Sequence, residues 1–323
     1  MGSRYLSRRI LQAILTIVGI VLLNFVLFRM MPGSPDRISH NPNASIEARA
    51  AIRARWGLDK PLFPDQFIDY VAATVQGDFG DSFKYKGKEV SNVIAGRVWP
   101  TLILFGLGEL IAIVAGLVLG AYSGWKRGGP VDYGGNGISL ILYSMPYFLL
   151  GMILLVIFAT ALGWFPTAGM FTLGQTNSSF VDQLWDFGSH LILPLAAVSL
   201  GLIGQYSILM RSSVIETRGD DYVTTARAKG ISDSRILRGH AVPNALLPTV
   251  SLIGINLGFI IAGAITVEVV FSWPGLGTLT QEALEARDYP LLQGIFLILA
   301  ITVVLANFLA DIVYGRLDPR VRT

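Results

Sequence analysis

Cysteine is absent from the 323 residues of this chain. Its absence excludes disulfides, thiolate metal sites and cysteine nucleophiles. Charged residues are scarce as well, at 15%, whereas soluble domains carry about a quarter. Hydrophobic residues instead make up 52% of the chain, and glycine occurs 35 times. This composition indicates a membrane protein in which helices pack closely.

Catalytic and nucleotide-binding motifs are missing too. The three histidines, His40, His190 and His240, are too scattered to predict a metal cluster. There is no G-x-x-x-x-G-K-[ST] phosphate loop, so we expect the chain itself to bind no ATP and to need no cofactor. Neither H-E-x-x-H nor G-x-S-x-G occurs, which argues against an intramembrane enzyme. The net charge of +3 is small and the basic residues lie in loops, a pattern of membrane topology and not of nucleic-acid binding.

Six apolar runs are long enough to span the hydrocarbon core, which takes about 20 helical residues. The sequence therefore predicts an all-α membrane protein. The first run begins after three arginines and exceeds the usual signal-peptide core of roughly 7–15 residues, with no A-x-A site after it, so we expect it to be retained. The predicted spans are approximately Ile10–Phe28, Thr101–Tyr122, Gly137–Leu162, Leu191–Met210, Thr249–Val267 and Leu291–Val313.

The loops between these runs differ in charge. Residues 163–189 contain no Lys or Arg, and residues 268–290 contain only Arg287. The other short loops and both termini are basic, and basic short loops stay in the cytoplasm. We therefore expect a multi-pass protein of the bacterial cytoplasmic (inner) membrane with both termini inside. The residues on which this depends are Arg4, Arg8, Arg9, Lys126, Arg127, Arg211, Arg218, Arg227, Lys229, Arg235, Arg238, Arg316, Arg320 and Arg322.

Residues 32–99 predict a small extracytoplasmic domain. Ser45 is placed to cap a helix over Ile46–Trp56 that Gly57 ends, and Pro64 to open a second one through about Gln76. The following GDFGDS (77–82) favours turns. The expected division is 1–31 for the N-terminus and first helix, 32–99 for this domain, and 100–323 for a five-helix core with a cytoplasmic loop at 211–247.

Few polar residues lie within the spans. Glu109 falls inside the second, where a charge costs at least about 2.5–3.5 kcal/mol. It is expected to be either a pore-lining group or a contact between helices or subunits. Arg29 and Glu268 lie at outer ends and Asp311 near the cytoplasmic end of the sixth span, where such side chains can reach water.

Two outer loops are expected to be ordered. Residues 163–187 begin with WFPTAG, a turn flanked by aromatic residues suited to the membrane interface. Residues 272–290 begin with SWPGLG and continue into a short helix, in which Thr278 and Gln281 have capping-box spacing and Glu282 falls in the first turn. That helix either covers the outer mouth of a pore or lies at the interface with no gating role. Possible pore or gate residues are Glu109, Glu268, Trp273, Pro274 and Gly275.

The most unusual stretch is Asp221–Pro248, which is charged and helix-prone between two apolar runs. It predicts a helix over Asp221–Lys229 with Gly230 at the C′ position, where a left-handed backbone is needed. Ser232 is placed to cap a second helix, Asp233–Ala241, that Pro243 ends. Such a corner favours docking of a soluble partner, and an amphipathic linker in the headgroups is the alternative. The expected coupling residues are Asp221, Tyr222, Ala226, Arg227, Ala228, Lys229, Gly230 and Pro243.

This stretch resembles the EAA signature of permease subunits of binding-protein-dependent ABC importers. Gly230 and Pro243 match its Gly and Pro, and Ala226 matches its second Ala. The Glu and first Ala are replaced by Thr224 and Thr225, and His240 stands at an apolar position, so the generic motif is only partly met. DYVTTARAKG followed by HAVPNALLP is similar to the form of the dipeptide/oligopeptide branch. The resemblance to its B-type subunit continues through RWGLDKP, GDFGDS, PTLILF, WFPTAG, HLILP, EVVFSWPGLG, RDYPLLQG and DIVYGRLDPR, in order along nearly the whole chain.

The resemblance implies a type I importer permease with six helices and a five-helix core, in which the corner at Gly230 is the coupling helix. It also implies three kinds of partner: a second similar permease, two nucleotide-binding subunits that hold ATP and Mg²⁺, and an extracytoplasmic substrate-binding protein. The expected cargo is di- or oligopeptides, and the same scaffold also serves oligosaccharides and nickel. Two other classes remain open: an ion-coupled secondary transporter, disfavoured because no inverted repeat is evident, and a purely structural membrane subunit.

Overall fold

The computed structural model describes residues 3–30, 45–47, 50, 60–174, 179–259 and 264–317. Within these ranges the ordered structure is helical apart from one isolated antiparallel bridge between Asp81 and Glu89. The all-α prediction is therefore confirmed for the described part of the chain.

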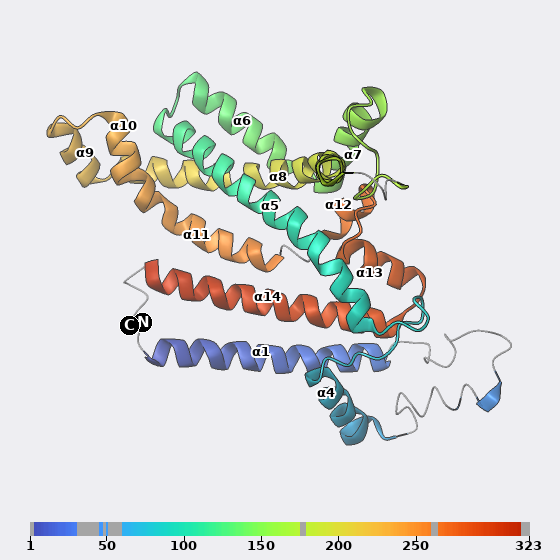
Figure 1. The fold of residues 1–323 in the computed structure, drawn as a ribbon. Helices are drawn as coiled ribbons and strands as arrows, with labels where there is room; N and C mark the ends of the chain where they lie inside the picture. The colour runs from blue at the N-terminus through green and yellow to red at the C-terminus, as the bar shows by residue number, and fades with distance from the viewer. Residues whose placement is uncertain are drawn as a thin grey trace.

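Four helices are long and apolar enough to cross a membrane. They are α1 (Ser3–Met30), α5 (Val90–Trp125), α8 (Phe180–Arg218) and α14 (Tyr289–Leu317). They contain the first, second, fourth and sixth predicted spans. An ion pair of 2.9 Å between Arg9 and Asp311 joins the start of α1 to the end of α14. These two helices therefore run antiparallel, side by side (Figure 1).

The third predicted span is not one straight helix, so that expectation is corrected. It consists of α6 (Pro130–Ser144), α7 (Tyr147–Leu154) and a π-helical segment, η2 (Leu155–Ala161). The chain bends by 103° between Ser144 and Tyr147. Pro146 accounts for the break, because a proline disfavours helical angles in the residue before it, and Met145 is extended (φ −88°, ψ 128°).

The fifth predicted span, Thr249–Val267, is divided between two helices. Its first part lies in α11 (Val242–Phe259) and its end in α12 (Ala264–Val270). Residues 260–263 lie outside the described residues. The helix α13 (Leu276–Glu285) follows α12 after a short turn.

Helices α5 and α8 pack closely through glycine. A Cβ on Gly120 would lie 2.4 Å from the carbonyl oxygen of Ser207, and one on Gly124 would lie 2.7 Å from that of Arg211. Side chains at these positions would force the two backbones apart, as in other membrane helix pairs built on small residues. Polar contacts add α6 to this pair: Ser139 donates to Ser207 at 2.8 Å, and Arg211 forms a two-point ion pair with Asp132 at 2.6 and 3.0 Å.

The segment after α1 forms a π-helical turn, η1 (Leu62–Gln66), and α4 (Phe67–Val75). Phe63 is extended (φ −126°, ψ 138°), so the helical path starts at Pro64 and ends one residue before the predicted Gln76. The rings of Phe63, Phe67 and Tyr70 surround Phe25 of α1 at 5.3–5.6 Å between centroids.

The turns predicted in GDFGDS are present, with positive φ at Gly77 and Gly80. Most of the helix expected over Ile46–Trp56 lies outside the described residues.

The two ends of the bundle carry different elements (Figure 1). Helices α9 (Asp221–Ala228) and α10 (Asp233–Ile236) lie at one end, together with the start of α1 and the end of α14 (Figure 1). Helix α13 and α4 lie at the opposite end. The arrangement puts the predicted coupling loop on the same side as both ends of the described chain.

Candidate functional site: the corner and the opposite end

The corner comprises residues 221–241, which form α9, a turn, α10 and a short π-helical segment, η3 (Leu237–Ala241). Helix α9 ends in a Schellman motif: the N–H of Gly230 donates to the carbonyl of Arg227 at 2.9 Å, and that of Ile231 to Ala226 at 3.2 Å. Gly230 has a φ of +76°. The left-handed backbone predicted at this position is therefore confirmed.

The corner is fixed from within by an apolar cluster. Val223 and Ala226 of α9 and Ile236 of α10 are buried against Trp125 and Met210, at the ends of α5 and α8. Ala226 is only 6% exposed. Of the two alanines among the predicted coupling residues, Ala226 therefore packs into the chain's own core, and Ala228 is exposed.

Trp125 supports the corner from outside the loop. The guanidinium of Arg227 lies 5.3 Å from its ring centroid and that of Arg218 lies 5.9 Å away. Arg218 also donates to the backbone carbonyl of Trp125 at 3.0 Å, and Arg227 forms a 3.4 Å ion pair with Asp233. The supporting role of Trp125 was not predicted from the sequence, because nothing in the loop specifies the distant residue on which the loop packs.

Pro243 does not end a helix, contrary to expectation. The chain continues from η3 directly into α11, with Pro243 as its second residue. A proline inside an α-helix clashes with the carbonyl four residues earlier. The wider π-helical path of η3 immediately before Pro243 accommodates the ring, and proline is well tolerated in the first turn of a helix. The corner is thus joined rigidly to α11.

The outward surface of the corner is polar, and Ala228 and Gly230 leave little side-chain bulk at its tip. Its exposed residues include most of those predicted for coupling, namely Asp221, Tyr222, Arg227, Ala228, Lys229 and Gly230. No atom lies within 4 Å of a Cβ placed on Gly230. A firmly supported, protruding helix end with little side-chain bulk can enter a groove on another protein.

At the opposite end, Glu268 holds the start of α13. Its side chain is fully buried and accepts hydrogen bonds from the Oγ1 of Thr101 at 2.6 Å and from the backbone N–H groups of Gly277 and Thr278 at 2.7 and 3.1 Å. A carboxylate is favourable here because the first N–H groups of a helix have no partner within it. Glu268 was expected to reach water and is instead an internal cap.

Trp273 and Gly275 complete this turn. The indole N–H of Trp273 donates to the carbonyl of Pro100 in α5 at 3.0 Å, and Trp273 is fully buried. The predicted capping box is absent: α13 begins at Leu276 after Gly275, so Thr278 and Glu282 lie further inside the helix. Thr278 donates instead to the carbonyl of Trp273 at 2.6 Å. Pro274 lies in the same turn and is half-buried.

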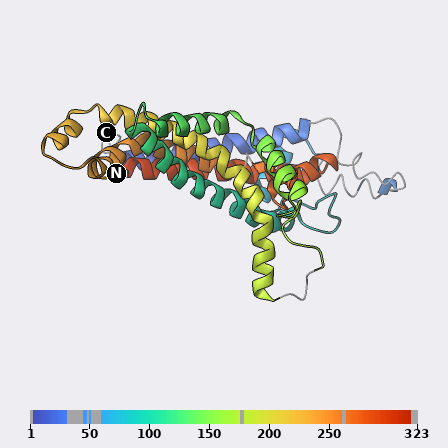
Figure 2. The ribbon, with the colours of Figure 1, turned by 90° about the horizontal axis from the view of Figure 1, so that it is seen from above.

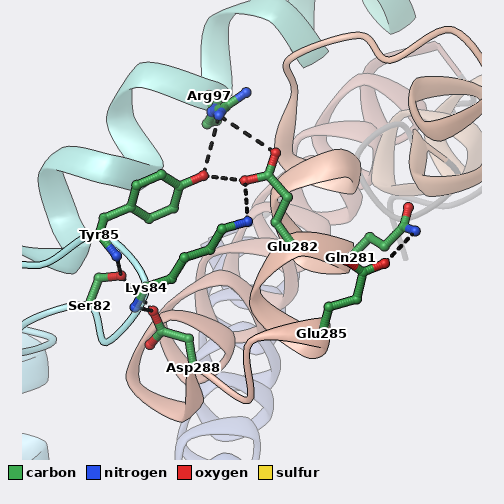
Figure 3. A network of polar contacts seen from close by, with 8 residues as sticks. All are labelled: Ser82, Lys84, Tyr85, Arg97, Gln281, Glu282, Glu285 and Asp288. Atoms are coloured by element: carbon green, nitrogen blue, oxygen red, sulfur yellow. Dashed lines mark hydrogen bonds and ion pairs between the residues drawn. The ribbon is translucent and has the colours of Figure 1, made fainter. Parts of the chain in front are cut away.

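A polar network ties α13 to the loop before α5 (Figure 3). The carboxylate of Glu282 accepts a hydrogen bond from the hydroxyl of Tyr85 and forms a 3.1 Å ion pair with Lys84. Arg97 of α5 lies 3.9 Å from the same carboxylate. Beside it, Asp288 is fully buried and accepts from Ser82 at 2.5 Å and from the backbone N–H of Lys84 at 3.0 Å.

The network changes how its groups ionise. Burial favours the neutral form of Glu282, but the hydrogen bonds from Tyr85 and Lys84 outweigh it and hold the pKa of Glu282 below its ordinary value. Burial and the adjoining carboxylate raise the pKa of Tyr85. Glu282 is therefore an anion with two close donors at neutral pH, and the contact between α13 and the loop is charge-assisted.

Glu109 is buried between three helices. It is 2% exposed and accepts a hydrogen bond from Tyr206 of α8. Asn256 of α11 donates to the Tyr206 hydroxyl at 2.9 Å and to Gln205 at 3.2 Å. Of the two expectations for Glu109, contact between helices is the one this geometry supports within the chain. The sequence could not predict this contact, since Tyr206 lies 97 residues away from Glu109.

Comparison with known proteins decides the family. Residues 116–323 match the binding-protein-dependent transport system inner membrane component family, and residues 2–103 match its N-terminal membrane component family. The chain belongs to this permease family. The first match contains the corner, Glu268 and α13; the second contains α1, α4 and Tyr85. As a family member, the permease is an inner membrane component, which agrees with the predicted location.

Several relatives of the permease match over almost their full length. A putative peptide permease protein of Brucella suis is 39% identical over 321 residues, covering 99% of both chains. An oligopeptide transport system permease protein, AppB, of Bacillus subtilis is 35% identical, covering 99% of both chains. A di/tripeptide transport system permease protein, DppB, of Pseudomonas aeruginosa is 37% identical, covering 98% of both chains.

The permease also shares its fold with a solved transporter. An inward-facing structure of the MetNI methionine ABC transporter superposes with a TM-score of 0.57 and 18% identity, covering 70% of this chain and 96% of that one. The predicted type I importer permease fold is therefore confirmed at the level of architecture.

Proposed function

We propose that this permease is the transmembrane pore subunit of an ATP-driven importer of di- or oligopeptides. The observation that carries the proposal is the 35–39% identity to permeases named for peptides, oligopeptides and di/tripeptides, which extends over 98–99% of this chain.

The corner is proposed as the coupling element to a separate ATPase. The Schellman turn and the cluster around Val223 and Ile236 hold it in one shape, and η3 joins it to α11 without a break. A displacement of the exposed Ala228–Gly230 end is therefore transmitted along α11 toward Asn256, which donates a hydrogen bond to Tyr206. A flexible linker in the headgroups would lack this support.

The proposed assembly contains a second, similar permease, two ATPase subunits that hold ATP and Mg²⁺, and an extracytoplasmic binding protein that delivers the substrate. The permease itself performs no hydrolysis. Both termini and residues 211–247 face the cytoplasm, and residues 32–99 form a separate outer domain ahead of the core at 100–323. The common end occupied by α9, the start of α1 and the end of α14 supports this orientation (Figure 1).

Oligosaccharide or nickel import on the same scaffold is the second candidate for cargo. In this proposal the binding protein selects the cargo, so uptake of labelled di- and oligopeptides by membranes that contain all subunits separates these candidates. Dependence of uptake on ATP and not on an ion gradient separates the importer from a secondary transporter. Unchanged uptake after deletion of this subunit would leave only a structural role.

Substitutions at the corner test the coupling. Gly230→Val is expected to abolish peptide uptake and weaken ATPase docking, because a β-branched residue resists the φ of +76° found there. Gly230→Asn is the control, since asparagine tolerates this conformation. Ala228→Glu adds bulk and charge at the exposed end, and Ala228→Ser is its small control. Recovery of the complex, substrate-stimulated ATPase activity and uptake are measured in the same membranes.

Membrane insertion of both variants is expected to be normal, because neither site lies in a predicted span. Substrate binding to the separate binding protein is expected to be unchanged. Full peptide uptake by both Gly230→Val and Ala228→Glu would rule out the corner as the coupling element. Loss of insertion by Gly230→Val alone would indicate misfolding, and the Ala228 pair would then decide the question.

A further inference from the structure

The first part of α8 leaves the bundle. Residues 180–188, here named the outer arm, project sideways from the long axis of the bundle in Figure 2 and are seen end-on in Figure 1. The arm starts with a complete capping box, in which Ser179 and Asp182 exchange hydrogen bonds. This capping box stabilises the first turn of the helix. The sequence predicted a loop for these residues, whereas they are helical in the structure.

The arm has two chemically distinct faces. Residues 180, 181, 184 and 185 lie within one side of the helix at 100° per residue, and 182, 183 and 186 lie on the other. The first face carries Phe180, Val181, Leu184 and Trp185, and these four are 79%, 71%, 59% and 81% exposed. The second carries Asp182, Gln183 and Asp186.

Both faces of the arm are largely open, since Asp182 and Gln183 of the polar face are exposed as well, and only Asp186 of that face is half-buried. Asp186 accepts hydrogen bonds from the backbone N–H of Thr172 at 2.7 Å and from its Oγ1 at 2.6 Å. This fixes the loop of residues 163–174 against the polar side of the arm. At the inner end, Phe187 packs on Phe171 and Trp273 at 5.7 and 6.0 Å between centroids.

A helix on a water-exposed surface buries its apolar face, whereas the arm leaves its apolar face uncovered by the rest of the chain. Contiguous exposed apolar surface of this kind marks contact with a membrane or another protein. The apolar face of the arm therefore needs a covering that is not water.

We propose that the outer arm lies in the outer membrane interface, with Phe180, Val181, Leu184 and Trp185 inserted among the lipids. Its axis crosses the bundle axis (Figure 2), as expected of a helix parallel to the membrane plane. Tryptophan and phenylalanine on the apolar side are typical of interfacial helices, and Trp164 in the adjoining loop is exposed as well.

Two further observations favour lipid over a protein partner. The loop of the arm follows η2 and α7, whose exposed Phe148, Met152 and Val156 make up part of the apolar surface of the bent third segment. This exposed apolar surface and the arm are thus continuous along the chain. In addition, residues 163–189 contain no lysine or arginine, as expected on the outer side. The arm anchors the outer end of α8 and, through Phe187 and Trp273, the turn that holds α13.

The absence of cysteine allows a direct test. Single cysteines replace Val181 or Leu184 on the apolar face, and Gln183→Cys is the matched control on the polar face. Each full-length chain is labelled with a polarity-sensitive fluorophore in nanodiscs of phosphatidylethanolamine and phosphatidylglycerol, with and without lipid that is spin-labelled near the headgroup. Fluorescence at 181 and 184 is expected to be quenched at least about twice as strongly as at 183.

A second measurement uses the native side chain. Brominated lipid is expected to quench part of the tryptophan fluorescence of the unmodified protein, and Trp185→Phe is expected to reduce that quenched part. Equal lipid quenching at 181, 183 and 184 would overturn the proposal. So would strong quenching of 181 and 184 by aqueous iodide. Protection of these positions that appears only when the second permease is added would assign the arm to a subunit contact and would likewise overturn it.

Discussion

Gly275 occupies a position at which any side chain would meet a buried carboxylate. A Cβ there would lie 2.1 Å from the Oε1 of Glu268 and 2.4 Å from its Cδ. Glu268 cannot withdraw, because Thr101 and the first turn of α13 surround it. Gly275 of the SWPGLG stretch is therefore required by the buried side chain of Glu268 as well as by its own turn.

Gly275→Ala is expected to destabilise the protein by about 1–3 kcal/mol, because the displaced carboxylate loses its backbone donors in α13 while remaining buried. The apparent Tm of the purified protein measures this. Gly137→Ala, where no atom lies within 4 Å of the new Cβ, is the control and is expected to be nearly neutral. Glu268→Ala combined with Gly275→Ala should cost no more than Glu268→Ala alone. Additive losses would show that the two positions act independently.

At the scale of elements, α13 is fastened at both ends by groups from elsewhere in the chain. Glu268 and Trp273 hold its start. Near its end, Glu282 within the helix and Asp288 just after it contact the loop that carries Lys84 and Tyr85 (Figure 3). A helix held in this way can cover an outer mouth and be released when the charge-assisted contacts break. Whether it gates transport stays a prediction.

Glu282→Gln is expected to loosen α13, because the side chain keeps its shape but loses its charge toward Lys84 and Tyr85. The effect should be about 1 kcal/mol or less, since Lys84 and Glu282 are partly exposed. Faster hydrogen exchange in α13 measures it. Glu285→Gln is the matched control, because Glu285 binds only Gln281 of the same helix among the described contacts. Equal acceleration by both variants would contradict a specific role for Glu282.

The same contact predicts a pH dependence. The pKa of Glu282 is lowered in the folded state, so its contribution to stability is complete above its unfolded pKa of about 4.3. That contribution is lost as the pH falls through the lower folded pKa. The wild type should therefore show an acid-induced increase in α13 exchange below about pH 4, and Glu282→Gln should lack that step.

At the scale of the whole molecule, different elements lie at the two ends of the bundle. The corner, the start of α1 and the end of α14 share one end, and α13 and α4 share the other (Figure 1). The family assignment makes the protein an inner membrane component. The charge asymmetry of the short loops then predicts which end faces the cytoplasm.

Single-cysteine labelling of intact cells or oriented vesicles tests this orientation. Thr167→Cys and Ser178→Cys are expected to react with a membrane-impermeant reagent from outside, and Lys126→Cys only from inside. Thr167 and Lys126 are exposed, and Ser178 lies outside the described residues. Labelling of Thr167→Cys or Ser178→Cys from the cytoplasmic side only would reverse the topology.

The sequence by itself determined the features that depend on local chemistry. Apolar runs gave the long helices, and the Ala-Lys-Gly ending of α9 predicted the positive φ of Gly230, because a helix end is decided by a few neighbouring residues. The order of short motifs along the chain also indicated the family. The residue-before-proline rule favours a break in the helix before Pro146. One continuous span was predicted instead, because the whole run is apolar.

Only the tertiary structure decided which side of each element is used. It placed Ala226 inward and Ala228 outward. It bonded Glu109 to Tyr206, whose hydroxyl also accepts from Asn256, and it made Glu268 a buried helix cap. It also made the outer arm a helix whose apolar face points away from the chain. The physical reason is that burial and hydrogen bonding depend on partners distant in sequence, and local periodicity carries no information about where those partners lie.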